Sequence, residues 1–383
     1  MTLFDIDLAE WTARGGQWTA REISQQPRVW GLAGELLAGD GGIALALRRL
    51  LERRELRIVL TGAGTSAFIG ECLAPALTQH LGRRVDAVST TDLVAGPQRW
   101  LQRDVPTLLV SFARSGSSPE SVAAVTLADQ FVEQCHHLVL TCNEAGELCA
   151  QGRAHPRGLV LVLPEESHDR GFAMTSSFTS LLLTAASLFG VLDAAPAAIA
   201  HLGAAARDAL ARGLPLARDL VAQKFERVIY LGSNEFKGLA REGALKLLEL
   251  TDGAIVANFD SPLGFRHGPK TIVNARTLVV LFVSNDPYTR QYDLDLLHEL
   301  RADGHAGRVL ALSGREDGLD VEAGDLVVAG MARASDLECA LPLAAFFQLF
   351  ALLQSMAHGL TPDNPSVSGT VTRVVHGVTI YPC

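Results

Sequence analysis

The sequence lacks an excess of basic residues, a low-complexity segment and any paired-cysteine motif. Its 383 residues include 33 Lys or Arg and 42 Asp or Glu, for a net charge of −9, so a general nucleic-acid-binding surface is not expected. Six cysteines show neither a CxxC pair nor a zinc-ligand spacing, and we predict that all six are reduced thiols. With 48% hydrophobic and 20% charged residues, the composition excludes a largely disordered chain.

Hydrophobic runs able to span a bilayer are also scarce. Residues 178–192 are too few, and residues 340–359 are interrupted by Pro342 and Gln348, so we predict buried core or interface helices for both. The acidic start, MTLFDIDLAEW, lacks the basic and apolar regions of a signal peptide. We therefore expect a cytoplasmic protein without a membrane or nucleic-acid partner.

What the chain does contain is a repeated alternation of short apolar runs and helix-length amphipathic stretches. Runs such as RIVLTG and TLLVSFA precede residue 165, and VIYLGS and TLVVLFVS follow residue 227. Apolar strands separated by helices predict parallel sheets that are covered on both faces. VLTGAGTSAFIGE and IYLGSNEFKGLAR align Gly62 with Gly232, about 170 residues apart, so the two groups of strands resemble copies of one unit.

We therefore predict an α/β protein with two tandem domains, because one core rarely serves this length. Each domain is expected to hold a parallel five-stranded sheet flanked by helices, in a three-layer αβα arrangement. The expected boundaries are an N-terminal helical segment over residues 1–50, a first domain over 51–205, and a second domain with a C-terminal tail over 206–383.

Two turns of the first copy are rich in hydroxyl groups: TGAGTSAF (61–68) and SFARSGSSPES (111–121). Ser118 suits the N-cap of a helix, Pro119 its first position and Glu120 its first turn. Helix N-termini attract anions, and ligands of parallel sheets bind where strands end. The two turns therefore predict a phosphate site. Ordinary turn and capping chemistry is the alternative, while no GxGxxG or GxxxxGK[ST] motif supports a dinucleotide or P-loop site.

The second copy has carboxylates and a lysine instead. Glu242, Lys246 and Glu249 follow i, i+4, i+7 spacing and share one helical stripe, which is either functional or a solvated face with an ion pair. His267 lies in the loop GFRHGPK beside Arg266 and Lys270. Positive neighbours favour the neutral imidazole, so His267 is an acid–base candidate.

These motifs resemble a known family. REGALKLLEL followed by RHGP resembles the isomerase half of glucosamine-6-phosphate synthase, and the serine turns resemble the phosphate loops of SIS (sugar isomerase) domains. AREISQQPRVW (20–30), SFARSGSSPES and the tail PDNPSVSGTVTRVVHGVTIYP (362–382) resemble the galactosamine-6-phosphate deaminase/isomerase branch, whose members are often labelled tagatose-6-phosphate ketose/aldose isomerases. The resemblance covers nearly the whole chain and implies two tandem SIS domains.

The resemblance also implies site residues. It places substrate phosphate ligands on Thr65, Ser66, Arg114 (through its backbone), Ser115 and Ser118. It places the base that moves a proton between carbons 1 and 2 on Glu249, its lysine partner on Lys246, and the ring-opening histidine on His267. SHDRGFAMTSSF (167–178) matches the loop that lines the sugar, so Thr175, Asp169 and Arg170 are expected to read it.

Departures from the synthase indicate the direction of the reaction. Only Arg373 is basic in NPSVSGTVTRVV, where the synthase has a Schiff-base lysine. We also expect no glutaminase domain before residue 1 and hence no internal supply of ammonia. A substrate that already bears nitrogen needs no such lysine. The sequence therefore favours conversion of galactosamine 6-phosphate to tagatose 6-phosphate and ammonia, with no metal or organic cofactor.

Two alternatives remain open. One is plain aldose–ketose isomerisation of a hexose 6-phosphate with the same Glu249; the other is a non-catalytic sugar-phosphate sensor, although residues 37–57 lack a convincing recognition helix. In the synthase the histidine comes from a neighbouring subunit. The resemblance therefore implies a homodimer or a dimer of dimers with shared active sites.

Overall fold

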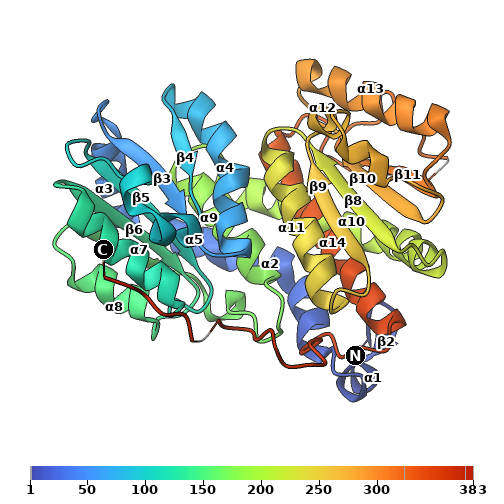
Figure 1. Cartoon of the computed structure of the whole chain (residues 1–383), viewed down its shortest axis with the longest axis horizontal. Helices are drawn as coiled ribbons and strands as arrows, with labels where there is room; N and C mark the ends of the chain where they lie inside the picture. Colours follow the sequence, from blue (N-terminus) through green and yellow to red (C-terminus); the bar gives the residue numbers. More distant parts are fainter. Residues whose placement is uncertain (1, 323, 376, 383) are drawn as a thin grey trace. The chain divides into compact units, whose positions relative to one another are not determined.

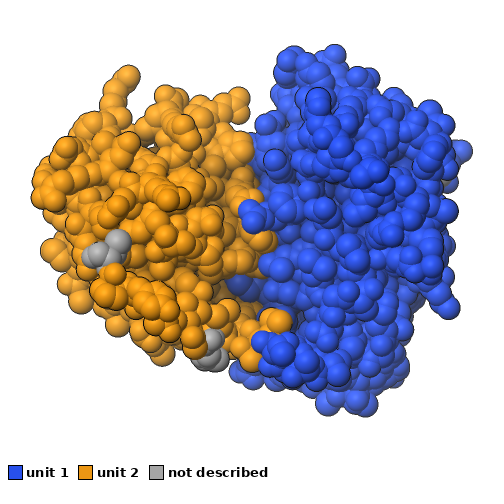
Figure 2. All heavy atoms as spheres, viewed as in Figure 1, with its two compact units in different colours: residues 1–28, 170–175, 200–370 blue, residues 29–169, 176–199, 371–383 orange. Residues whose placement is uncertain are grey.

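The computed structural model describes residues 2–322, 324–375 and 377–382, so His376 and Cys383 lie outside the described residues. The chain divides into two compact units, coloured separately in Figure 2. Unit 1 comprises residues 1–28, 170–175 and 200–370, and unit 2 comprises residues 29–169, 176–199 and 371–383.

This division differs from the expected boundaries at both chain ends. The N-terminal residues belong to unit 1, where the backbone N–H groups of Trp18 and Thr19 donate to the carboxylate of Asp363 at 3.0 and 2.8 Å. The last part of the C-terminal tail, from residue 371, belongs to unit 2, where the backbone carbonyl of Arg373 accepts a hydrogen bond from Arg114. Both contacts join segments that are distant in sequence, and hydrophobic periodicity carries no signal for such pairs.

Each unit contains one parallel five-stranded sheet, labelled in Figure 1. In unit 2 the order is β4-β3-β5-β6-β7, with bounds β3 Arg57–Thr61, β4 Val85–Ala87, β5 Thr107–Ala113, β6 Cys135–Thr141 and β7 Gly158–Val162. In unit 1 the order is β12-β11-β10-β8-β9, with bounds β8 Arg227–Gly232, β9 Val256–Asp260, β10 Thr277–Phe282, β11 Arg308–Ser313 and β12 Leu326–Val327. The predicted α/β fold with two parallel five-stranded sheets is confirmed.

The two sheets have the same topology. In each five-stranded sheet, numbering its own strands in chain order, the first strand lies between the second and the third, and the fourth and fifth follow the third. Chain order reverses between the first and third strands, and ligands of open parallel sheets bind beside such a reversal, at the carboxyl ends of the strands. In unit 2 this point lies between β3 and β5, the two strands that the hydroxyl-rich turns follow.

Helices cover both faces of each sheet (Figure 1). In unit 2, α4 (Thr65–Leu81) and α9 (Ser176–Leu188) pack on one face, and α5 (Thr90–Ala95), α7 (Pro119–Phe131) and α8 (Glu147–Ala154) on the other. In unit 1, α11 (Glu235–Leu250) and α14 (Asp336–Ala357) oppose α12 (Pro262–Phe265) and α13 (Pro287–Asp303). Neighbouring strand residues separate the faces: Ile229 joins the core under α13, while Tyr230 contacts Phe347 of α14.

The remaining elements are short or connect the units. They are β1 Thr2–Leu3, β2 Ile6–Asp7, α1 Leu8–Ala13, α2 Gln17–Gly39, α3 Gly41–Leu51, α6 Pro97–Trp100, η1 Glu165–Ser167, α10 Pro196–Ala222 and η2 Pro269–Ile272.

The most apolar helix is a core element. Asp336–Ala357 is long and apolar enough to cross a bilayer, but its most apolar 18-residue window is completely buried in the fold. Its N-terminus carries a capping box in which Ser335 and Glu338 satisfy each other's backbone N–H groups. The prediction of a buried helix is confirmed. The five described cysteines are free and buried, as packed thiols are.

Candidate active site

The loop from β3 to α4 runs tightly into a helix N-terminus in unit 2. A Cβ atom on Gly62 would lie 2.6 Å from the carbonyl carbon of Ser66, so only glycine fits there. Gly64 caps the helix with φ of +56°, and α4 begins at Thr65. Thr65 and Ser66 therefore lie in the first turn, where backbone N–H groups and the helix dipole favour an anion.

The loop from β5 to α7 has the predicted capping pattern. Ser118 is the N-cap, Pro119 follows it and Glu120 lies in the first turn, while the Ser118 hydroxyl makes no capping hydrogen bond. The backbone carbonyl of Ser115 accepts a hydrogen bond of 2.8 Å from Asn143, which supports the loop from the neighbouring turn. Since β3 pairs with β5, both loops leave the same edge of the sheet.

Two further hydroxyl groups lie at this edge. Thr61 ends β3 and is paired in register with Ser111, two residues before the end of β5, and both are buried. Their hydroxyl oxygens have no hydrogen-bond partner within the described residues, an arrangement that costs about 1 to 3 kcal/mol per group. They are additional candidates for ligand contact. The sequence signal for both was a hydroxyl residue close to the carboxyl end of an apolar strand, although each is also typical of an ordinary strand.

Unit 1 repeats the loop backbone but not its chemistry. A Cβ atom on Gly232 would lie 2.6 Å from the carbonyl carbon of Phe236, as at Gly62, and Asn234 has φ of +50°, close to that of Gly64. Glu235 therefore occupies the place that Thr65 has in unit 2. Asp286 caps α13 before Pro287, as Ser118 caps α7, but it accepts the N–H groups of Tyr288 and Thr289 itself.

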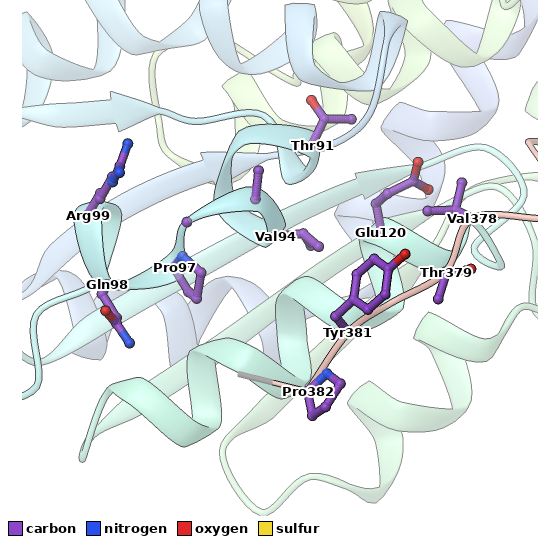
Figure 3. A pocket seen from close by; sticks show the side chains of 12 residues that line it. Thr91, Val94, Pro97, Gln98, Arg99, Glu120, Val378, Thr379, Tyr381 and Pro382 are labelled. Carbon is purple, nitrogen blue, oxygen red and sulfur yellow. The ribbon is translucent and has the colours of Figure 1, made fainter.

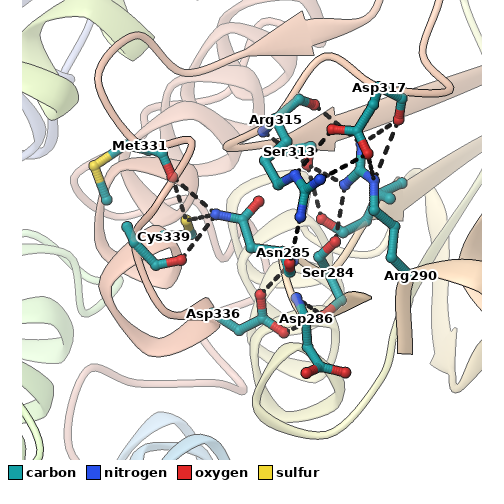
Figure 4. Close-up of polar contacts among 12 residues, drawn as sticks. Ser284, Asn285, Asp286, Arg290, Ser313, Arg315, Asp317, Met331, Asp336 and Cys339 are labelled. Carbon is teal, nitrogen blue, oxygen red and sulfur yellow. Dashed lines mark hydrogen bonds and ion pairs between the residues drawn. The ribbon is translucent and has the colours of Figure 1, made fainter. Parts of the chain in front are cut away.

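The same edge of unit 1 is filled by its own polar groups (Figure 4). Asp336 accepts hydrogen bonds from the Ser284 hydroxyl and, at 2.7 Å, from the backbone N–H of Asn285. The buried guanidinium of Arg290 donates to the carbonyl of Ser284 and the hydroxyl of Ser313. Carboxylates and internal hydrogen bonds replace open hydroxyls, so the second copy is not a phosphate cradle.

The carboxyl group of Glu235, at the start of α11, has a raised pKa. Burial, with smaller contributions from the negative charges of Asp336 and Asp286, raises the pKa of Glu235 to about 7. The folded state therefore holds a proton that the unfolded state releases above a pH of about 4.5. Stability that is present below this pH is lost as the pH rises to about 7.

Glu235→Gln should therefore raise the free energy of unfolding at pH 8, by about 1 to 3 kcal/mol, and change it much less at pH 5. Urea unfolding at the two pH values measures the difference. Glu316→Gln, at an exposed carboxylate of the same unit, is the control. Equal effects of Glu235→Gln at both pH values would contradict the assignment.

The predicted stripe on α11 is a buried charge cluster. The Lys246 Nζ atom lies 3.5 Å from a carboxylate oxygen of Glu242 and pairs directly with Glu249. The side chains of Lys246 and Glu242 are fully buried, whereas that of Glu249 is 23% exposed. A solvated surface ion pair is therefore excluded, and Glu249 is the carboxylate of this cluster that a substrate can reach.

His267 lies in the predicted loop and is exposed. Its positive neighbours are neutralised: Arg266 lies 2.8 Å from Glu299, and Lys270 pairs with Glu299 and Asp303. The sequence argument from adjacent positive charge is therefore weakened. Within the described residues its ring makes no hydrogen bond, which leaves it available to an external group.

The three residues expected to read the sugar differ in their burial and in their contacts. Thr175 is completely buried, and its carbonyl accepts a hydrogen bond from Gln348. The Asp169 carboxylate is buried and accepts the backbone N–H groups of Ser176 and Ser177 at the start of α9. Arg170 is exposed and stacks on Trp18. Asp169 thus stabilises a helix N-terminus, and its role in reading the sugar stays a prediction.

The paired loops on a repeated parallel α/β unit define a protein of the SIS domain class, and the SIS domain family is matched over residues 50–190. An AgaS relative from Streptomyces coelicolor is 51% identical over 95% of both chains. The D-galactosamine-6-phosphate deaminase AgaS of Escherichia coli is 46% identical over 97% of both. The crystal structure of tagatose-6-phosphate ketose/aldose isomerase from Escherichia coli matches with a TM-score of 0.84 and 44% identity over all of both chains.

The chain belongs to the AgaS family of SIS proteins. The resemblance stated from the sequence is confirmed, and the chain is an enzyme, as these relatives are.

Proposed function

We propose that the enzyme converts galactosamine 6-phosphate and water to tagatose 6-phosphate and ammonia. The observation that carries the proposal is the buried Glu242–Lys246–Glu249 cluster, in which one carboxylate remains accessible. A general base needs this combination of access and a fixed, partly desolvated environment. The name of the Escherichia coli relative supports the same reaction.

The reaction begins with the substrate phosphate at Thr65, Ser66, Ser115 and Ser118, beside the backbone of Arg114. His267 assists opening of the pyranose ring, which exposes an aldehyde at carbon 1 next to the amine on carbon 2. Glu249 removes the proton from carbon 2 and returns it to carbon 1 through an enolamine, while a second proton passes from the nitrogen to the oxygen on carbon 1. The resulting ketimine at carbon 2 adds water and releases ammonia, which leaves the ketose 6-phosphate.

Lys246 and Glu242 support the base Glu249 in different ways. Lys246 is buried against Glu249, so its positive charge, rather than direct contact, stabilises negative charge that develops on the substrate oxygen during proton transfer. Glu242 balances the buried ammonium from the other side, so Lys246 keeps an ionic partner when Glu249 takes up the proton. No residue of this cluster forms a covalent bond with the substrate.

The substrate assignment is tested by ammonia release across a panel of hexosamine 6-phosphates. We expect the highest kcat/KM with galactosamine 6-phosphate. The competing aldose–ketose isomerisation predicts interconversion of tagatose 6-phosphate with its aldose and no ammonia from any amino sugar, and that pattern would overturn the proposal.

We further propose that the enzyme acts in the cytoplasm as a homodimer or dimer of dimers with shared active sites. The support is His267, which is exposed and forms no ring hydrogen bond within the described residues. An acid–base residue that completes a neighbouring subunit's site must reach out of its own chain.

Subunit mixing tests the shared site. Glu249→Gln and His267→Ala proteins should each be nearly inactive, and mixtures should recover part of the activity because some assembled sites receive both intact residues. Activity is measured after verified subunit exchange. Mixtures no more active than the separate proteins would show that each chain carries a complete site.

A further inference from the structure

The C-terminal tail forms hydrogen bonds with the region of the phosphate loop at Arg373. The backbone carbonyl of Arg373 accepts a hydrogen bond of 2.6 Å from the guanidinium group of Arg114, and the guanidinium group of Arg373 donates to the backbone carbonyl of Asp169. Asp169 in turn holds the first N–H groups of α9. Arg373 therefore joins the loop after β5 to the start of α9, and all these residues belong to unit 2.

The end of the tail lacks hydrogen bonds. Within the described residues, positions 377–382 make none, and Tyr381 is 78% exposed. This end of the tail lines a cavity of about 630 Å³ together with Pro97, Arg99 and Glu120, and Figure 3 shows Val378 and Thr379 close to Glu120. A second cavity of about 650 Å³ is lined by residues of α7 and by Ile380, Tyr381 and Pro382 of the tail. Among the described residues, the hydrogen bonds at Arg373 join the tail to the phosphate loop and to Asp169.

Arg114 has an unusual position for a loop residue. It is only 7% exposed although it follows the last residue of β5, and its side chain extends to the tail. The next residue, Ser115, carries a proposed phosphate contact. Fixing the Arg114 side chain restricts the backbone of the loop, and a restricted loop loses less conformational entropy when it binds its ligand.

We propose that Arg373 is a positioning residue that, together with Arg114, clamps the tail and holds residues 114–118 in the conformation that binds phosphate. The inference rests on the proposed function for the location of the phosphate. In this proposal the tail forms no covalent bond with the substrate. Its role is to fix the conformation of the loop that binds the phosphate.

Binding of inorganic phosphate to the full-length protein, measured by calorimetry, tests the clamp without requiring turnover. Arg114→Ala should raise the dissociation constant about tenfold and Arg373→Ala about fivefold, because each removes a hydrogen bond from a charged group. The dissociation constant of the double variant should exceed that of Arg114→Ala by no more than about twofold, because both residues act through the same attachment. Arg373→Lys, which can still donate to the Asp169 carbonyl, should stay within about twofold of wild type.

Arg103→Ala is the control, because Arg103 precedes β5 at its other end and forms an exposed ion pair with Glu133. It should leave phosphate binding unchanged. In substrate assays the clamp variants should raise KM and leave kcat within about twofold. An unchanged dissociation constant in folded Arg373→Ala protein, or fully multiplicative effects in the double variant, would overturn the clamp. If the wild type binds phosphate but releases no ammonia, the proposed reaction fails while the clamp stands.

Discussion

Glu249→Gln protein is expected to lose at least about 100-fold in turnover, because removal of a general base typically costs about 100- to 10,000-fold in rate. Glutamine keeps the shape and the hydrogen-bonding capacity of the side chain but cannot accept the proton from carbon 2. Lys246 retains Glu242 at 3.5 Å as a partner, so the buried ammonium is not left without a counter-charge. Substrate binding by calorimetry should remain within about threefold of wild type.

Glu242→Gln separates the two carboxylates of the cluster. Because Glu242 is fully buried, we expect it to support Lys246 rather than take the proton, and its variant should retain more turnover than Glu249→Gln. Near-normal turnover of Glu249→Gln, with collapse of Glu242→Gln, would transfer the role of base to Glu242.

Replacing both Ser115 and Ser118 with alanine should weaken substrate binding by about 1 to 3 kcal/mol for each phosphate hydrogen bond lost. Turnover at saturation should decline less, since the phosphate lies away from the reacting carbons. The Ser118 hydroxyl makes no capping bond, so its removal does not unravel α7. The measurement is KM and kcat with the sugar phosphate.

Ser117→Ala is the matched control on the same loop. The Ser117 hydroxyl accepts the backbone N–H of Glu147 and therefore serves the fold. We expect a small effect on KM for this variant. If the Ser115→Ala, Ser118→Ala double variant has the same KM as wild type, these two hydroxyl groups do not bind the substrate phosphate and the proposed phosphate site is wrong.

The fold was predictable because its signals are local and repeated. Apolar strand runs, the aligned glycines Gly62 and Gly232, and the cap residues Ser118 and Pro119 each specify a backbone arrangement over a few residues. The same local logic predicted that Lys246 and Glu249 share one face of a helix. It also predicted that the second copy has a different task from the first.

What the sequence could not supply was burial and long-range contact. Periodicity places Glu242 on a stripe but does not say that a second helix covers it, so a solvated face remained possible until the side chain proved fully buried. The attachment of the tail through Arg373 depends on a partner 259 positions away. The raised pKa of Glu235 depends on burial and, to a smaller extent, on the charge of Asp336, which lies at the start of another helix.

The most direct test of the central claim is one NMR progress curve. Purified enzyme is incubated with galactosamine 6-phosphate, and ammonium and the ketose 6-phosphate are quantified in the same sample. The account predicts that both appear at equal rates as substrate disappears and that Glu249→Gln suppresses both together. Unchanged substrate under conditions where the enzyme interconverts tagatose 6-phosphate with an aldose phosphate, without ammonium, would contradict it.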